Sequence, residues 1–192
     1  GFAFANTKNS PASRALEIHI LLPLSRQCEP SDLAMLFRAK ASDPETLSER
    51  QNEPICSLAS NGKYFFYFTA GGQIGVASGD FPIGPFKDAL GKPLLKKKEA
   101  GIKYCIDPCV FIDDDGQAYL YYGGARQLGV VKLKEDMITR DGPIQLLEMP
   151  KFYEGVWIHK RNGNYYASYP TREGQDTQAS VLVYSMAKSP LG

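Results

Sequence analysis

The stretch Tyr104–Gly124, YCIDPCVFIDDDGQAYLYYGG, decides the fold. It predicts a β-hairpin in which Cys109–Ile112 is an apolar strand, Asp113–Gly116 an acidic turn and Ala118–Tyr122 an aromatic return strand. Aspartate and glycine tolerate the positive φ angles of tight hairpin turns, and aromatic residues favour strands. Asp107 stands apart, because a carboxylate at the start of an apolar strand is costly unless it is paired or faces a wet cavity.

The hairpin pattern repeats along the chain. Turn dipeptides occur at Asn61-Gly62, Asp115-Gly116 and Asn162-Gly163, which are 54 and 47 residues apart. An aromatic residue follows each turn after four residues and again after seven, and a second apolar strand comes later. These aromatic residues are Phe65 and Phe68, Tyr119 and Tyr122, and Tyr166 and Tyr169. Units of about 40 to 50 residues with several short strands are typical of a β-propeller.

The repeat predicts an all-β protein with about three propeller blades, at residues 52–100, 101–147 and 148–192. Residues 1–51 do not follow the repeat and are expected to form an irregular N-terminal segment. Within this segment, Ala15–Leu24 predicts a buried strand. Two further stretches, which begin at Ser31 or Asp32 and at Asp43, have the capping residues of short helices.

A carboxylate precedes each turn by eight residues. The three residues are Glu53, Asp107 and Glu154. A propeller brings equivalent positions of successive blades around one axis, so we expect these side chains to converge at one end of a central funnel. Simpler interpretations stay open at this point. Asp107 before Pro108 is typical of an Asx-Pro turn, and Glu154 before Gly155 is typical of a solvated loop.

Composition restricts the class of partner. A chain of 192 residues with 43% hydrophobic and 22% charged residues is typical of a globular domain, and a net charge of +1 argues against nucleic acid. No apolar run reaches the length of a membrane span, and no signal peptide is visible. The localisation is otherwise unknown. The cysteines lack the spacing of a zinc site, so we expect buried free thiols, which lean toward a reducing, cytoplasmic compartment. They are Cys28, Cys56, Cys105 and Cys109.

Three segments resemble glycoside hydrolase family 43. Ile106–Gly116, IDPCVFIDDDG, resembles the family's central motif, and Tyr153–Tyr166, YEGVWIHKRNGNYY, resembles its general-acid motif. Ile74–Ala77 together with Gly84–Ala89 resembles a further family segment. The resemblance covers residues 52–192. It implies a propeller of the five-bladed type that hydrolyses arabinose- and xylose-containing plant polysaccharides.

The resemblance also implies roles for individual residues. Glu154 matches the family's general acid, and Asp107 matches the aspartate that adjusts the pKa of that acid. The aspartate that serves as general base in the family's first blade has no recognisable counterpart here, which leaves Asp43 and Glu53 as candidates. Trp157 is a candidate for sugar contact. Its alternative role, like that of the many tyrosines, is packing between blades.

We therefore expect an inverting glycosidase of the α-L-arabinofuranosidase or β-xylosidase type. Such enzymes hold their acid and base roughly 6.5–9.5 Å apart, which leaves room for the attacking water. The alternatives are a carbohydrate-binding propeller fragment without catalysis and an inactive truncated product, and an open blade edge favours self-association.

No catalytic cofactor is required. The family sometimes carries a calcium ion in the propeller channel, but the sequence does not place one. The acidic stretch Asp113–Asp115 is predicted to be a solvated turn, because it lacks the spacing of a calcium loop.

Overall fold

The computed structural model describes residues 3–5, 54–60, 62–82, 84–172 and 180–192, and almost all of their regular secondary structure is antiparallel β-strand. One turn of 3-10 helix, η2 (Lys97–Glu99), lies between the first two sheets in the chain. The strand and helices predicted between residues 15 and 45 lie outside the described residues. The described strands form three four-stranded sheets, which confirms the predicted all-β architecture.

The first two sheets are meanders of four consecutive strands, and the third combines three consecutive strands with one from the start of the chain. Blade 1 contains β2 (Pro54–Ser60), β3 (Lys63–Ala70), β4 (Gln73–Gly79) and β5 (Lys87–Asp88). Blade 2 contains β6 (Cys109–Ile112), β7 (Ala118–Gly124), β8 (Gln127–Leu133) and β9 (Arg140–Leu147). Blade 3 contains β10 (Trp157–Arg161), β11 (Asn164–Arg172) and β12 (Ser180–Ala187), and β1 (Ala3–Ala5) pairs with β12 as its outer strand.

The hairpin predicted at the centre of the sequence is present in blade 2. Strands β6 and β7 pair in the register that places Cys109 opposite Tyr121 and Ile112 opposite Ala118. The acidic turn closes with a hydrogen bond of 2.9 Å from the Gly116 amide to the Asp113 carbonyl. The turn and the two strands therefore lie where the sequence predicts them.

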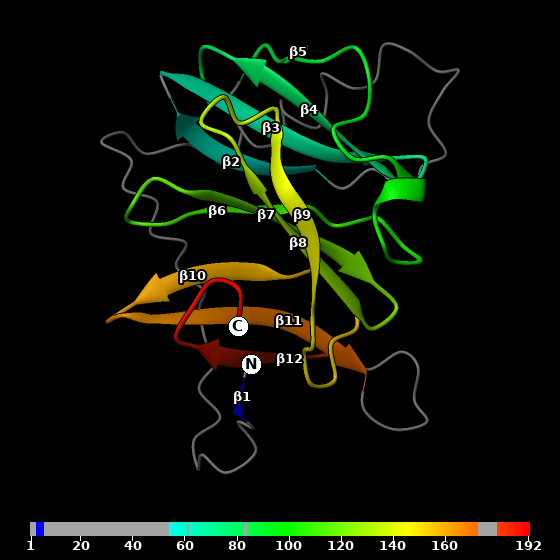
Figure 1. Ribbon diagram of the computed structural model, residues 1–192, viewed down its shortest axis with the longest axis vertical. Helices are drawn as coiled ribbons and strands as arrows, with labels where there is room; N and C mark the ends of the chain where they lie inside the picture. Colours follow the sequence, from blue (N-terminus) through cyan, green and yellow to red (C-terminus); the bar gives the residue numbers. More distant parts are fainter. Residues whose placement is uncertain (1–2, 6–53, 61, 83, 173–179) are drawn as a thin grey trace.

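The three blades lie side by side, with blade 2 between the other two (Figure 1). This arrangement explains the burial patterns of the central strands. Every residue of β7 is buried, because both of its faces are covered by neighbouring blades. In β3 and β11, buried residues alternate with more exposed ones, because in the described chain only the face toward blade 2 is covered. One apolar core lies on each side of blade 2.

The side chain of each repeated aromatic residue that is buried lies in one of these two cores. Phe65 and Tyr119, four residues after their turns, face the blade that follows. Tyr122 and Tyr169, seven residues after their turns, face the blade that precedes. The two positions lie three residues apart on one strand, so they point to opposite faces of the sheet. The sequence repeat therefore reports how each blade packs on its two neighbours.

Hydroxyl groups of buried tyrosines connect distant segments through backbone carbonyls. Tyr67 of blade 1 donates to the Met137 carbonyl of blade 2 at 2.7 Å. Tyr121 and Tyr122 of blade 2 donate to the carbonyls of Pro190 at 2.6 Å and Ala100 at 2.8 Å. A buried phenol needs such a partner, because an unpaired polar group is costly in an apolar core.

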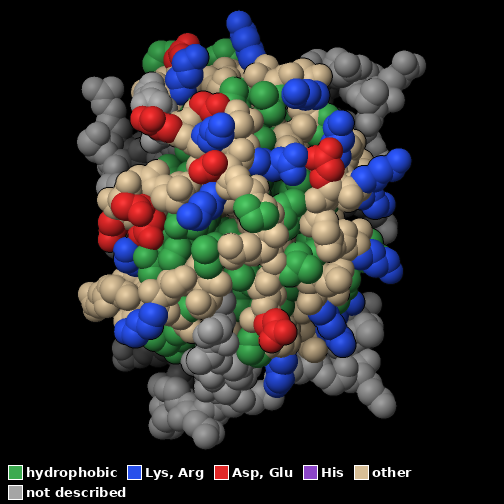
Figure 2. Space-filling view, viewed as in Figure 1, with side chains coloured by type: hydrophobic (Ala, Val, Ile, Leu, Met, Phe, Trp, Pro, Cys, Tyr) green, Lys and Arg blue, Asp and Glu red, His purple; other side chains and the backbone are tan. Residues whose placement is uncertain are grey.

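The surface carries charges of both signs. Figure 2 shows lysine and arginine side chains spread over the visible face between acidic and apolar ones, without a continuous basic stripe. Within the part of the chain that the structure describes, no helix is long and apolar enough to cross a membrane.

Candidate active site

Asp107 and Glu154 lie in the segments that lead into the first strands of blades 2 and 3. Asp107 comes two residues before β6, and Glu154 comes three residues before β10. The first strands of neighbouring blades contact each other, β2 with β6 and β6 with β10. The fold therefore brings the two residues to the same end of adjacent strands, as the repeat predicted.

Asp107 is held in an unusual conformation. Its φ of 52° lies in the left-handed region, which aspartate tolerates better than most residues. The preceding carbonyl, that of Ile106, accepts a hydrogen bond of 2.9 Å from the Gly123 amide in β7. The half-buried Asp107 carboxylate accepts a hydrogen bond at Oδ2 from the Gly155 amide at 3.1 Å. This contact ties the carboxylate to the peptide that immediately follows Glu154.

Glu154 is half-buried and is anchored through its backbone. It forms an isolated antiparallel bridge with Gly124, at the end of β7. On one side, the Tyr153 carbonyl accepts a hydrogen bond from the Arg126 amide at 3.2 Å. On the other, Gly155 has a φ of 54°, a conformation in which a side chain would be strained. The motif's glycine thus allows the turn that places its amide against Asp107.

The remaining sequence-predicted acids have no described position. Glu53 and Asp43 both lie outside the described residues. Strand β2 begins at Pro54 and contacts β6. Convergence of a third acid with Asp107 and Glu154 remains a prediction.

Trp157 and the buried tyrosines occupy different environments. Trp157 is the first residue of β10 and is 53% exposed, three residues after Glu154. It alternates with buried Ile158, so its ring lies on the face of blade 3 that is turned away from blade 2. By contrast, Tyr67, Tyr121 and Tyr122 are at most 1% exposed, so these three serve in blade packing. A sugar contact by Trp157 remains a prediction.

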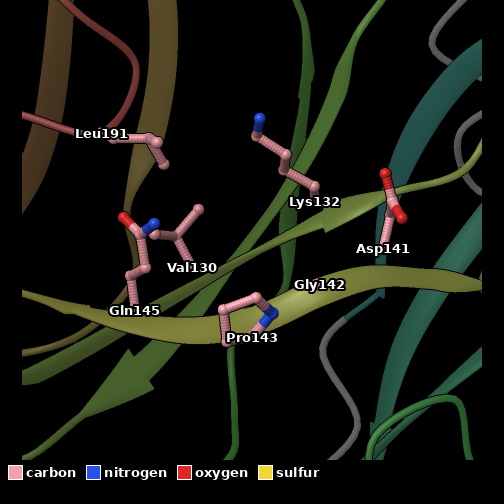
Figure 3. Close-up of a pocket in the computed structure, with 7 residues that line it drawn as sticks. All are labelled: Val130, Lys132, Asp141, Gly142, Pro143, Gln145 and Leu191. Carbon is pink, nitrogen blue, oxygen red and sulfur yellow. The ribbon is translucent and has the colours of Figure 1, made fainter.

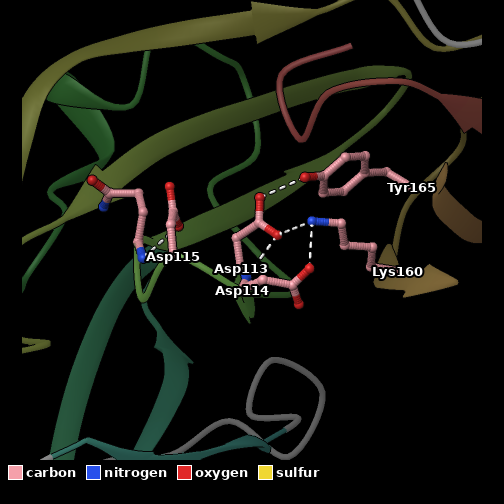
Figure 4. A network of polar contacts seen from close by, with 6 residues as sticks. Asp113, Asp114, Asp115, Lys160 and Tyr165 are labelled. Atoms are coloured by element: carbon pink, nitrogen blue, oxygen red, sulfur yellow. Dashed lines mark hydrogen bonds and ion pairs between the residues drawn. The ribbon is translucent and has the colours of Figure 1, made fainter. Parts of the chain in front are cut away.

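The prediction of a solvated acidic turn was wrong for Asp113. Its side chain is 9% exposed and bonds to blade 3, where Lys160 Nζ lies 2.6 Å from Oδ1 and the Tyr165 hydroxyl lies 2.5 Å from Oδ2 (Figure 4). Burial alone would raise the pKa of the Asp113 carboxyl, but the hydrogen bonds from Lys160 and Tyr165 outweigh it and lower the pKa. Asp114 is 85% exposed, as expected of a turn, and also contacts Lys160 at 2.8 Å. The turn therefore fastens blade 2 to blade 3.

One hollow lies apart from the two carboxylates. This cavity has a volume of about 250 Å³ and lies between β8, β9 and the C-terminal segment (Figure 3). It is lined by Val130, Lys132, Asp141, Gly142, Pro143, Gln145 and Leu191. Neither Asp107 nor Glu154 contributes to it, so it is not the candidate active site.

The described residues contain no group of three histidine, cysteine, aspartate or glutamate side chains that could hold a metal ion. The calcium ion implied by the family resemblance remains a prediction without assigned ligands.

The two cysteines whose side chains are described, Cys105 and Cys109, are free and buried, as expected. Burial raises the pKa of the Cys105 thiol to about 12 and that of Cys109 to about 11.

Curated relatives of the chain are glycosidases. It is 36% identical over 161 residues to an arabinoxylan arabinofuranohydrolase of Bacillus subtilis, covering 72% of this chain and 31% of the relative. It is 40% identical over 133 residues to a beta-D-galactofuranosidase of Aspergillus niger, covering 67% of this chain and 38% of the relative. The chain thus spans about a third of the length of these two relatives.

Solved structures show the same fold. An alpha-L-arabinofuranosidase from Clostridium thermocellum matches with a TM-score of 0.66 and 39% identity, covering 72% of this chain and 48% of that one. The arabinoxylan arabinofuranohydrolase from Bacillus subtilis, solved with cellotetraose, matches with a TM-score of 0.64 and 34% identity, covering 72% and 34%. These matches confirm the predicted propeller fold. The sequence model of glycosyl hydrolases family 43 matches residues 41–192. The chain therefore belongs to glycosyl hydrolases family 43.

Proposed function

We propose that this protein hydrolyses the glycosidic bonds of arabinose- and xylose-containing carbohydrates as an α-L-arabinofuranosidase or β-xylosidase. The observation that supports the proposal is the hydrogen bond between the Asp107 carboxylate and the Gly155 amide. It joins the two segments that resemble the family's catalytic motifs, just before the first strands of adjacent blades, β6 and β10. A packing role alone would not require a half-buried carboxylate on each of these two segments.

In the proposed inverting reaction, Glu154 donates its proton to the glycosidic oxygen as the bond to the anomeric carbon breaks. A base removes a proton from water, whose oxygen attacks the anomeric carbon from the opposite face. Asp107 is a positioning residue, because its bond to the Gly155 amide orients the peptide beside Glu154. The base is not assigned, and Asp43 and Glu53 remain its candidates.

Hydrolysis of p-nitrophenyl α-L-arabinofuranoside and β-D-xyloside tests the role of Glu154. We expect Glu154→Gln to lower kcat by about 10²- to 10⁴-fold, the range for removal of a general acid. Asp141→Asn is the matched control, because Asp141 is an exposed carboxylate on β9 that touches neither segment. Full activity of folded Glu154→Gln would refute the assignment. NMR of the first product anomer reports whether the configuration is inverted.

Two variants of Asp107 separate its hydrogen bond from its charge. Asp107→Asn keeps an oxygen that can accept from the Gly155 amide, whereas Asp107→Ala removes both the acceptor and the charge. If Asp107 acts by orienting the peptide, Asn should retain more of kcat than Ala, with little change in KM. Equal losses in both variants would show that the negative charge matters instead.

The exposed ring of Trp157 favours a second candidate, a propeller that binds carbohydrate without cleaving it. Calorimetry with xylo- and arabino-oligosaccharides separates the two. Binding without turnover supports the second candidate, and Trp157→Ala should then weaken binding.

The same preparation can be tested for self-association through its blade edges by sedimentation velocity at several concentrations.

A further inference from the structure

A second cavity is lined by Tyr153, the residue that precedes Glu154 in the chain. It has a volume of about 610 Å³, within the range of roughly 300–1,000 Å³ that is typical of small-molecule sites. It is lined by Arg126, Met149, Lys151, Phe152, Tyr153, Thr171 and Arg172. These residues come from the β7–β8 turn of blade 2, the segment that leads into β10, and the end of β11. Two neighbouring blades therefore build the cavity together.

The cavity and the candidate active site are built on neighbouring residues of one segment. Tyr153, one of its lining residues, is the residue before Glu154. The Tyr153 carbonyl is fixed by the Arg126 amide at 3.2 Å, so another lining residue holds this segment in place. A carbohydrate bound at Glu154 would therefore present its neighbouring substituents to this cavity.

The lining is strongly cationic. Arg126, Lys151 and Arg172 contribute positive charge, and among the described residues that line the cavity there is no aspartate or glutamate. Within the described part of the chain, neither Arg126 nor Arg172 forms an ion pair. The Arg172 guanidinium carbon lies 4.0 Å from the centroid of the Tyr153 ring. This contact orients the guanidinium without neutralising its charge.

Thr171 adds a hydroxyl donor to this lining. The residue is 1% exposed, and its Oγ1 has no hydrogen-bond partner in the described structure. A buried hydroxyl without a partner is uncommon, because its desolvation is not compensated. The hydroxyl therefore lies unused in the cavity wall, with its oxygen closed to solvent.

We propose that this cavity is a subsite for the carboxylate of a uronic acid substituent on the carbohydrate. Guanidinium groups match the planar carboxylate with paired hydrogen bonds, which makes arginine suited to this ligand. The Tyr153 ring supplies an apolar surface for the sugar ring that carries the carboxylate. The inference rests on the proposed function, because only a carbohydrate held at Glu154 brings such a substituent here. The subsite adds a preference to that function: carbohydrates with acidic branches bind more tightly than those with neutral branches.

Calorimetry with two matched ligands tests the subsite. One ligand is a xylo-oligosaccharide with a single glucuronic acid branch, and the other is the same compound with its carboxyl group reduced to an alcohol. We expect the acidic ligand to bind about tenfold more tightly, the ratio that one or two charge-assisted hydrogen bonds provide. Arg126→Gln and Arg172→Gln should each reduce this ratio several-fold. Arg161→Gln is the control, because Arg161 is exposed on β10 and does not line the cavity.

The outcomes separate this inference from the proposed function. Equal binding of the two ligands would overturn the subsite and leave carbohydrate binding intact. A ratio that falls as much in Arg161→Gln as in the cavity variants would also overturn it, because the preference would then come from the overall charge. Binding of neither ligand would refute both proposals. Thermal melts of all three variants check that each is folded, and the exposed positions of these arginines make loss of the fold unexpected.

Discussion

Tyr67 offers the sharpest test of how the blades are joined. Its side chain is 1% exposed between blades 1 and 2, and its hydroxyl donates to the Met137 carbonyl at 2.7 Å across 70 residues of sequence. Tyr67→Phe removes only the hydroxyl and keeps the ring in the core. The variant therefore isolates one inter-blade hydrogen bond from the apolar packing around it.

The expected cost follows from the partner that is left behind. Without the hydroxyl, the Met137 carbonyl loses its bond in a buried position, which costs about 1–3 kcal/mol of unfolding free energy. No cavity contribution is added, because the ring remains. For a chain of this size, each kcal/mol lowers the Tm by about 2–4 °C, so we expect a decrease of about 2–12 °C.

The same variant has a second signature at alkaline pH. Burial, and to a lesser degree the charge of Asp136, raises the pKa of Tyr67 well above its ordinary value of 10.0. A raised folded pKa contributes stability that is complete below pH 10 and is lost as the pH rises from there toward the folded pKa. In that window, one such tyrosine lowers the unfolding free energy by about 1.4 kcal/mol per pH unit. Tyr67→Phe should therefore lose stability less steeply above pH 10.

Denaturant unfolding followed by circular dichroism between pH 7 and pH 11 measures both effects. The matched control is Tyr64→Phe, which removes a hydroxyl from the same strand at a half-buried position on the opposite face. We expect this control to change the unfolding free energy by less than about 0.5 kcal/mol, as surface substitutions usually do. Equal losses in both variants at pH 7, or identical alkaline slopes for Tyr67→Phe and the parent, would refute the reasoning.

Three further predictions concern the packing, the inter-blade ion pair and the thiols. Gly129→Ala should lower the unfolding free energy by about 1–3 kcal/mol in denaturant titrations, because its Cβ would lie 2.5 Å from Tyr122 Cζ. Asp113→Asn should make the unfolding free energy fall less steeply as the pH is lowered into the acid range. Hydrogen bonds lower the pKa of Asp113 below 3.8, so its stabilisation is present above that pH and is lost as the pH falls through the folded pKa. Acid titration of the circular dichroism signal measures this change. Iodoacetamide at pH 8 should leave Cys105 and Cys109 unmodified in the folded chain and label both after unfolding, as read by peptide mass spectrometry.

The sequence was sufficient for the blades because their determinants are local and repeated. The Asp-Gly turn, the aromatic residues after it and the apolar return strand lie within one hairpin. Even the glycines of strands β4 and β8 have a local reason. Gly75 stands opposite Phe68, and Gly129 stands opposite Tyr122. A Cβ at either glycine would lie 2.4–2.5 Å from the aromatic ring, so the blade needs glycine there. Such cross-strand pairs leave a signal at fixed spacing.

Contacts between blades leave no pattern of fixed spacing in the sequence. The partners of Asp113 are Lys160 and Tyr165, 47 and 52 residues away. From its neighbours alone, Asp113 resembles any solvated turn residue. The cationic cavity was equally hidden, because Arg126 lies in a turn of blade 2 and Arg172 at the end of β11 in blade 3. Asp107 and Glu154 were found because they recur at the same position before successive turns and lie in segments that resemble family motifs. The general base had neither a recognisable repeat nor a described position to identify it.

Blades 2 and 3 contact each other at both ends of their first strands, β6 and β10. Strand β6 has Asp107 before it and Asp113 after it, and only four residues lie in the strand itself. At one end Asp107 accepts from Gly155, and at the other Asp113 accepts from Lys160. At about 3.3 Å per residue, the two contacts lie roughly 20 Å apart along the strands. Two fixed points on adjacent strands leave little freedom for one strand to slide or rotate against the other. The ion pair at Asp113 therefore supports the spacing of Asp107 and Glu154, although it lies at the far end of the strands.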